Sequence, residues 1–221
     1  MSVMKIFFDT EFTGLHKNTT LISIGLVDEN DRTFYAEFSD YDESQCDEWI
    51  HENVINHLKW SKEGPIENFE NISENTSFSK ADIINNKVKN FANIYVDDWE
   101  AYGTKEYIKT VLTDWLSTYD SVELVSDCCH YDMVLFIDIF GGAFDIPKNV
   151  NPACHDINQD IAKYYKITER EAFDLSREGI VEIYNELVKP WPNRVINIEG
   201  DKHNALYDAK VIKVINKIAN G

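Results

Sequence analysis

The chain has 221 residues, of which 43% are apolar, so it can form one domain with a packed core and is not disordered throughout. It carries 21 Lys and Arg against 39 Asp and Glu, which gives a formal net charge of −18. Proteins that hold nucleic acid by their overall field are basic. This chain is therefore excluded from that class, unless a local site or bound metal ions supply the attraction. Clustered carboxylates are also the ligands that Mg²⁺ and Mn²⁺ prefer.

The termini and cysteines indicate the compartment. The start, MSVMKIFFDTEF, meets charge at once, unlike a signal peptide, and no stretch approaches the ~20 apolar residues of a membrane helix. The four cysteines form no CxxC pair and no Cys/His pattern with zinc spacing. We therefore expect a soluble, cytoplasmic protein without membrane contact.

The first 40 residues predict three strands. Residues 4–9 are a short apolar run that ends in an acid, and residues 20–28 are rich in Ile, Leu and Val. The turn cluster at 28–32 separates them from the alternating stretch 33–40. Short connections between such runs favour an antiparallel meander.

The next region gives a weaker signal. Residues 49–60 place apolar side chains at helical spacing. Residues 61–82 are polar, rich in Asn, Ser and Glu, and interrupted by Gly-Pro, whereas 83–101 fit a helix or a strand equally well. We predict an insertion or long loop around 61–105 within a single domain that spans 1–221.

Helices and strands alternate after this region. Residues 106–119 form an amphipathic helix, 121–127 a strand, and 131–140 a helix that Gly141-Gly142 ends. Residues 150–156 favour a short fifth strand.

The remainder of the chain is predicted to be helical. Asp156 is placed to cap a helix over 157–165. Residues 172–188 and 204–220 complete the pattern. The order of elements predicts a mixed α/β fold with one sheet and helices on its faces.

Asp9 and Glu11 lie two residues apart at the end of the first strand. Period two directs both side chains to one face of the sheet, where two like charges repel and lose hydration. A divalent cation removes that cost, although an acidic chain contains such pairs by chance and a capping acid in a turn is the plain alternative. Gly14, which follows closely, allows close backbone approach to a ligand.

A third carboxylate is expected just after the fourth strand. Asp132 begins a helix, where the helix dipole favours a negative charge, so a capping role competes with a metal-binding role. Asp127 ends the strand itself and is the rival for the same position. We favour Asp132, because apolar neighbours fix it on a packed helix.

The stretch HNALYDAKVI supplies a histidine five residues ahead of an aspartate. Asp208 would lie about one turn inside the last helix, while His203 precedes that helix. This suits a fixed metal ligand and a mobile base. His155 and Asp160 have the same spacing, so spacing alone does not choose between the two pairs.

The surrounding residues resemble a known family. FFDTEFTGL (7–15), HYDMVLF (130–136) and HNALYDAKVI (203–212) resemble, in order, three motifs of the DnaQ-like or DEDDh 3′–5′ exonucleases. CHDINQDIAKYY resembles the family segment before the last motif, which makes His155 structural. Length and the FxDTEF start are most similar to the small bacterial and phage 3′–5′ exoribonucleases.

The resemblance implies an RNase H-like fold with a five-stranded mixed sheet in the order 3-2-1-4-5. It implies two Mg²⁺ or Mn²⁺ ions, which in such sites stabilise the attacking and leaving oxygens. It also implies that His203 is the general base, with a side chain suited to take a proton from water at neutral pH. The four carboxylates implied as metal ligands and catalytic residues are Asp9, Glu11, Asp132 and Asp208.

The resemblance also implies a substrate. Water would attack the last phosphodiester of single-stranded RNA and release a nucleoside 5′-monophosphate. Single-stranded DNA is the first alternative, because only contact with the 2′-OH separates the two, and a non-catalytic nucleic-acid-binding relative is the second. A homodimer is expected from relatives. Phe12 replaces the usual Thr and could stack on a base. The residues expected to bind substrate are Thr10, Phe12, Thr13, Gly14 and Leu15.

Overall fold

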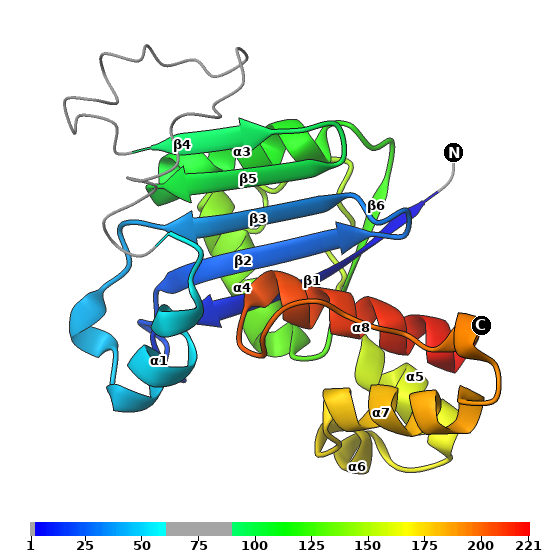
Figure 1. Ribbon diagram of the computed structural model, residues 1–221. Helices are drawn as coiled ribbons and strands as arrows, with labels where there is room; N and C mark the ends of the chain where they lie inside the picture. The colour runs from blue at the N-terminus through cyan, green and yellow to red at the C-terminus, as the bar shows by residue number, and fades with distance from the viewer. Residues whose placement is uncertain (1–2, 61–89) are drawn as a thin grey trace.

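The computed structural model describes residues 3–60 and 90–221 and has one mixed sheet at its centre (Figure 1). The strand order is β4-β5-β3-β2-β1-β6-β7. Three long, apolar strands lie in the middle, β1 (Met4–Phe12), β2 (Leu21–Asp28) and β3 (Thr33–Phe38), and pair antiparallel as a meander. β6 (Val122–Ser126) lies parallel to β1, and β7 (His155–Asp156) lies parallel to β6. The predicted order of five strands is therefore present inside this sheet.

The number of strands was underestimated. β4 (Phe91–Ile94) and β5 (Asp98–Gly103) extend the sheet beyond β3, so it has seven strands and not five. β5 pairs parallel with β3, and β4 pairs antiparallel with β5. Both strands fall within the predicted insertion or long loop around 61–105, whose last part therefore contributes to the sheet. The predicted polar loop at 61–82 lies outside the described residues.

One face of the sheet packs against two helices. α3 (Lys105–Leu116) and α4 (Cys129–Phe140) cover Ile6 and Phe8 of β1, and Trp115 of α3 is fully buried against Phe34 of β3. α4 starts earlier than its predicted residue 131. It ends as predicted, with Gly141 in the left-handed conformation.

The other face packs against α8 (Ala205–Asn220), which lies across β1 and β2 (Figure 1). α5 (Ile157–Tyr165) and α7 (Arg177–Val188) pack against α8, and α6 (Glu169–Phe173) packs against α5. The predicted helix over 172–188 is interrupted, because the Ser176 side chain accepts a hydrogen bond from the backbone N–H of Gly179 and starts a new helix.

The segment between β3 and the undescribed residues contains only short helical turns. Asp47 caps α1 (Glu48–Asn53), which is shorter than the predicted helix over 49–60. The 3-10 turns are η1 (Glu43–Gln45), η2 (Ile55–His57) and, before α8, η4 (Pro192–Arg194). No helix among the described residues is both long enough and apolar enough to cross a membrane.

Gly25 sets the distance between α8 and the sheet. A Cβ atom built at Gly25 would lie 2.2 Å from the Leu206 backbone nitrogen, closer than atoms can approach. We expect Gly25→Ala to push away the first turn of α8 and to lower the free energy of unfolding by roughly 3 kcal/mol. Chemical denaturation would measure this loss. Gly142→Ala is the control, since its Cβ would meet only the end of the Asp145 side chain. Equal stability of the two variants would contradict the packing argument.

Candidate active site

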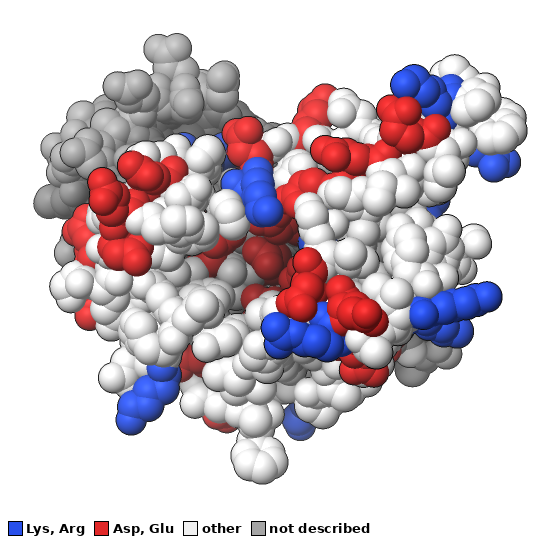
Figure 2. Space-filling model, turned by 90° about the horizontal axis from the view of Figure 1, so that it is seen from below, with Lys and Arg blue, Asp and Glu red and all other residues white. Residues whose placement is uncertain are grey.

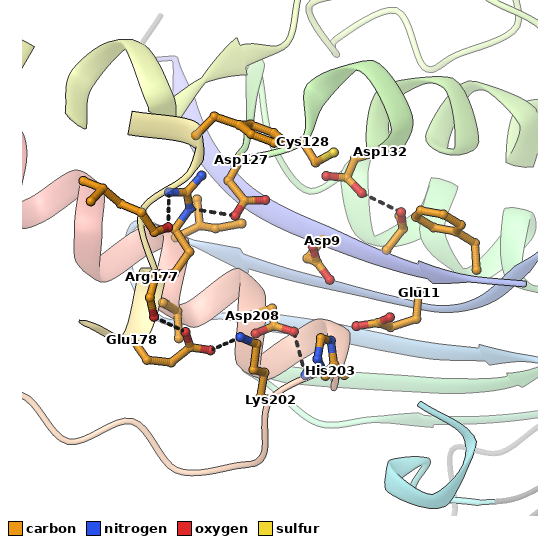
Figure 3. Close-up of a pocket in the computed structure, with 17 residues that line it drawn as sticks. Asp9, Glu11, Asp127, Cys128, Asp132, Arg177, Glu178, Lys202, His203 and Asp208 are labelled. Carbon is orange, nitrogen blue, oxygen red and sulfur yellow. Dashed lines mark hydrogen bonds and ion pairs between the residues drawn. The ribbon is translucent and has the colours of Figure 1, made fainter. Parts of the chain in front are cut away.

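A pocket of about 390 Å³ opens where β1 and β6 end. Three other segments complete it: the start of α4, the turn between α6 and α7, and the loop that leads into α8. Side chains distant in sequence therefore point into one space (Figure 3). The polar and charged residues that line it are Asp9, Thr10, Glu11, Asp127, Cys128, Asp132, Ser176, Arg177, Glu178, Lys202, His203 and Asp208.

Strand geometry places the first two carboxylates. Asp9 and Glu11 alternate with Thr10 along β1, so they share the face of the sheet that α8 covers. Thr10 and Phe12 point to the face covered by α4. The prediction that Asp9 and Glu11 would lie on one face is confirmed, and both side chains border the pocket (Figure 3).

Asp132 is the most buried of the carboxylates that line the pocket, with only 1% of its surface exposed. The Thr10 hydroxyl donates to Asp132 Oδ1 at 2.6 Å, and the Ser126 hydroxyl donates to Asp132 Oδ2. The backbone N–H of Cys128 donates to the Ser126 hydroxyl. These contacts fix the Asp132 carboxylate at the joint between β1, β6 and α4.

Asp127 lies in the same pocket but has a different partner. Arg177 Nε donates to Asp127 Oδ2 at 2.9 Å. The same guanidinium donates to the Asn158 side chain and to the backbone carbonyls of Ala172 and Leu175. Arg177 therefore joins the end of β6 to α5 and to the α6–α7 turn, and it compensates the charge of Asp127.

Asp208, the last of the four predicted carboxylates, lies in the first turn of α8. The Asn204 side chain caps this helix by accepting from the backbone N–H of Leu206 and of Tyr207. Asp208 Oδ2 accepts a hydrogen bond from the backbone N–H of His203 at 2.9 Å. His203 has a φ of +63°, a left-handed conformation that is uncommon outside glycine.

Burial, an aromatic ring and nearby charges surround the His203 side chain. Its ring meets Trp49 of α1 edge to face, with ring centroids 5.1 Å apart. Burial lowers the pKa of His203, and the nearby charge of Lys202 lowers it further, while Glu178 opposes both. A neutral imidazole can accept a proton at neutral pH.

Burial of so many like charges raises the pKa of the site carboxylates. Desolvation is the first cause for each, and it raises the pKa of Asp132 and of Asp208 to about 7. The pKa of Asp9 and of Glu11 is also raised well above the ordinary range, by burial and then by repulsion from the other site acids. A cation in the pocket would relieve this repulsion.

Six side chains of the pocket form two groups of potential metal ligands. Within each group, the ligand atoms lie within 4.8 Å of one another. One group is Glu11, His203 and Asp208, and the other is Asp9, Asp127 and Asp132. Oxygen-rich groups of this kind fit hard divalent cations such as Mg²⁺ or Mn²⁺. Asp127, the rival of Asp132 in the sequence analysis, therefore lies in the same ligand group as Asp132.

The second pair with the same spacing lies elsewhere. His155 Nε2 and Asp160 Oδ2 are 2.7 Å apart and tie β7 to α5. Neither residue lines the described pocket. The interpretation of His155 as structural agrees with this geometry.

Two of the five residues expected to bind substrate line the pocket, namely Thr10 and Phe12. Thr10 is buried and its hydroxyl donates to Asp132, and its contact with substrate stays a prediction, as does that of Phe12. Thr13 is also buried, and its hydroxyl is bonded within the β1–β2 turn, where it accepts from the N–H of Thr20. Contact between substrate and Gly14 or Leu15 stays a prediction, and Leu15 is 76% exposed.

Arg177 and Trp49 were not anticipated as parts of the site. Arg177 is 50 residues from Asp127 in the sequence, and no local pattern indicates that Trp49 of α1 contacts His203. The sole sequence signal for Arg177 is its place just after a helix cap, Ser176, where an arginine is unremarkable.

We expect Arg177→Lys to lower the free energy of unfolding by roughly 2–3 kcal/mol, because lysine cannot reproduce four directed hydrogen bonds and would leave Asp127 poorly paired. Activity should fall with it, since Asp127 and the α6–α7 turn line the pocket. The control is Arg170→Lys, whose ion pair with Asp174 lies on the surface. Thermal unfolding and turnover are measured for both variants. Equal effects would contradict the proposal that Arg177 links β6, α5 and the α6–α7 turn.

Comparison with known proteins identifies the family of this chain. Residues 4–218 match the profile of the 3′–5′ exoribonuclease Rv2179c-like domain. The chain belongs to this family. It therefore carries a 3′–5′ exoribonuclease domain of this family, and the motif resemblance noted above is confirmed. No curated protein matches the chain significantly.

Two solved structures share the RNase H-like fold of this exoribonuclease domain. The first is described as "3′-end specific recognition of histone mRNA stem-loop by 3′-exonuclease", with a TM-score of 0.52 and 14% identity. It matches 98% of this chain, which spans only 63% of that structure's length. The second is the nuclease domain of 3′hExo, a DEDDh family member, bound to rAMP. It has a TM-score of 0.51 and 14% identity over 96% of this chain and 88% of that one.

Proposed function

We propose that this domain is a divalent-metal-dependent exoribonuclease that removes nucleoside 5′-monophosphates from the 3′ end of single-stranded RNA. The observation that carries the proposal is the convergence of two three-residue ligand groups on one pocket, with His203 at its edge. Family membership supports the direction of cleavage and the choice of RNA.

Asp9, Glu11, Asp132 and Asp208 would hold the metal ions, with Asp127 beside them. When bound, two divalent ions supply positive charge that offsets the charge developing on the phosphate during attack. Their presence would also lower the pKa of the carboxylates to the ordinary range, so that all are ionised at neutral pH. Thr10, Ser126 and Asn204 keep the ligands in place.

In this proposal His203 accepts the proton of the attacking water. Its lowered pKa keeps the imidazole neutral at neutral pH, and Trp49 restricts its ring. The hydrogen bond from its backbone N–H to Asp208 couples the position of the base to a ligand carboxylate. The α6–α7 turn lines the pocket.

His203→Ala should slow hydrolysis by roughly 10²- to 10⁴-fold, the usual contribution of a general base, while leaving Mn²⁺ affinity nearly unchanged. Initial rates and calorimetric titration with Mn²⁺ check both parts. The position of His203 beside Glu11 and Asp208 also fits a different role, in which His203 is a metal ligand and not the base. A large loss of Mn²⁺ affinity would establish that assignment and remove the proposed base.

The test of the function uses single-stranded RNA and DNA of one sequence, each labelled at the 5′ end. Each is incubated with the protein in Mg²⁺, Mn²⁺ or EDTA. Stepwise shortening from the 3′ end that requires the metal, and is faster for RNA, supports the proposal. Faster shortening of DNA would move the substrate to DNA. Binding without shortening of either would favour a non-catalytic relative. Light scattering in the same buffer tests the expected homodimer.

A further inference from the structure

Two thiols meet next to the pocket, where α4 begins and the chain enters β7. The Sγ atoms of Cys129 and Cys154 are 3.0 Å apart, although the two residues are separated by 25 positions in the sequence. Cys129 Sγ also lies 3.3 Å from the backbone oxygen of His155, the first residue of β7. Both cysteines are free thiols, so the fold brings them into direct contact without a bond between them.

This contact allows a disulfide to form with little movement. A disulfide bond is ~2.05 Å long, so the two sulfur atoms need to approach by roughly 1 Å. Cys129 and Cys154 are both partly exposed, which lets a small reagent reach them. The other two cysteines have different surroundings. Cys128 Sγ lies 3.8 Å from His130 Nε2, and Cys46 packs against a separate apolar cluster.

The backbone of Cys128 connects the thiol pair to the carboxylate of Asp132, and both residues line the pocket (Figure 3). The Cys128 N–H donates to the Ser126 hydroxyl at 2.9 Å, and that hydroxyl donates to Asp132 Oδ2. The Cys128 carbonyl accepts from the backbone N–H of Asp132 at 3.1 Å. Because Cys129 directly follows Cys128, a shift of Cys129 toward Cys154 would disturb both contacts.

We propose that Cys129 and Cys154 form a redox-sensitive modification site, at which a low-molecular-weight disulfide reversibly converts the two thiols into a disulfide. The bond draws the start of α4 toward β7 and loosens the contact between Ser126 and Asp132. Binding of a divalent ion beside Asp132 is weakened as a result. This effect on the metal rests on the proposed function, whereas formation of the bond does not.

The chemistry consists of two successive thiol–disulfide exchanges. The thiolate of one cysteine attacks a sulfur of the small disulfide, a mixed disulfide forms, and the other half leaves as a thiolate that takes up a proton. The second cysteine attacks the protein sulfur of the mixed disulfide, and the remaining half leaves in the same way. The two protein thiols lose two electrons and two protons, which reduce the small disulfide to two thiols. An excess of that thiol reverses both steps.

An uncharged reagent suits the charge of the surface. Figure 2 shows many acidic side chains around a central hollow, and the whole chain has a net charge of −18. Such a surface repels an anionic disulfide. The reagent is therefore 2-hydroxyethyl disulfide, whose reduced form is 2-mercaptoethanol. The reduced, metal-free protein is incubated with it, and gel filtration removes the small molecules before each measurement.

Mass spectrometry provides the first readout. We expect the oxidised protein to be lighter than the reduced protein by two hydrogen atoms, and peptide mapping to join Cys129 to Cys154. Cys46→Ser is the matched control and should form the same bond, because Cys46 packs against a separate cluster. Failure to form a disulfide, or a disulfide that includes Cys46 or Cys128, would overturn the inference.

Calorimetric titration with Mn²⁺ provides the second readout. The oxidised protein should bind Mn²⁺ roughly 10- to 100-fold more weakly, the range for loss of a partner that orients a metal ligand. Treatment with 2-mercaptoethanol should restore the affinity. A double variant, Cys129→Ser with Cys154→Ser, should bind Mn²⁺ equally well before and after the reagent, with thermal unfolding to verify that it is folded.

These readouts separate the inference from the proposed function. Unchanged Mn²⁺ affinity in the disulfide form, or an equal loss of affinity in the folded double variant, would overturn the effect on the metal. Hydrolysis of single-stranded RNA is measured beside them and should fall with the Mn²⁺ affinity. RNA that the reduced protein never shortens, with both readouts as expected, would refute the proposed function and leave the thiol site standing.

Discussion

Asp208→Asn is expected to reduce hydrolysis by about 10³-fold or more, because it removes a charged ligand from ions that stabilise the transition state. The substitution keeps the shape of the side chain, and its amide oxygen can still accept from the backbone N–H of His203. The fold should therefore survive. Turnover of labelled RNA measures the loss of hydrolysis, and calorimetric titration measures the loss of Mn²⁺ affinity.

The chain contains its own control for this substitution. Asp160 has the same spacing from His155 that Asp208 has from His203, but it lies outside the pocket lining. Asp160→Asn should leave turnover and Mn²⁺ affinity unchanged. Loss of activity in both variants, with both folded, would mean that the pocket is not the catalytic site.

Metal-free protein should become less stable as pH rises, and divalent ions should reverse the loss. The folded-state pKa of Asp132 and of Asp208 is raised to about 7 from an ordinary value of 3.8. Between these values the unfolded chain releases protons that the folded chain retains, so the stability present below the lower value is lost as pH rises through the upper one. Mg²⁺ or Mn²⁺ binds the ionised carboxylates and adds stability where it was lost.

Thermal unfolding in EDTA and in excess Mg²⁺ would measure this, at about pH 5 and about pH 8. We expect a lower Tm in EDTA at the higher pH, and an increase of several degrees on adding Mg²⁺ there, with little change at the lower pH. KCl at equal ionic strength controls for general screening. Asp208→Asn should make the dependence on pH shallower, whereas buried Glu37, with a pKa raised to about 7 by burial, contributes in both proteins. A Tm that rises with pH in EDTA would contradict the account.

Local patterns in the sequence predicted most of the sheet. β1, β2 and β3 are apolar or alternating and bounded by turn residues, so their existence and pairing followed from the sequence. β4 and β5 did not, because Phe91–Ile94 is short and Asp98–Gly103 mixes acids with aromatic residues. β5 is fixed by pairing with β3, and β4 by pairing with β5. Tertiary pairing of this kind leaves little trace in a local pattern.

The same distinction holds for the site. Asp9, Glu11, Asp132, His203 and Asp208 belong to ordered motifs, and the structure brings all five to one pocket. Arg177 and Trp49 act through contacts across the fold, and no spacing rule connects them to their partners. The hydrogen bond from the Thr10 hydroxyl to Asp132 likewise joins residues 122 positions apart, so no local pattern could predict it.

The contact of α8 with Gly25 has a consequence for the timing of activity during protein synthesis. β1, with Asp9 and Glu11, is synthesised before His203, Asp208 and the helix that seats on Gly25. A nascent chain that lacks α8 would lack two of the residues proposed to hold metal and to act as base. On the proposed function, such a chain would cleave no RNA until α8 docks on Gly25.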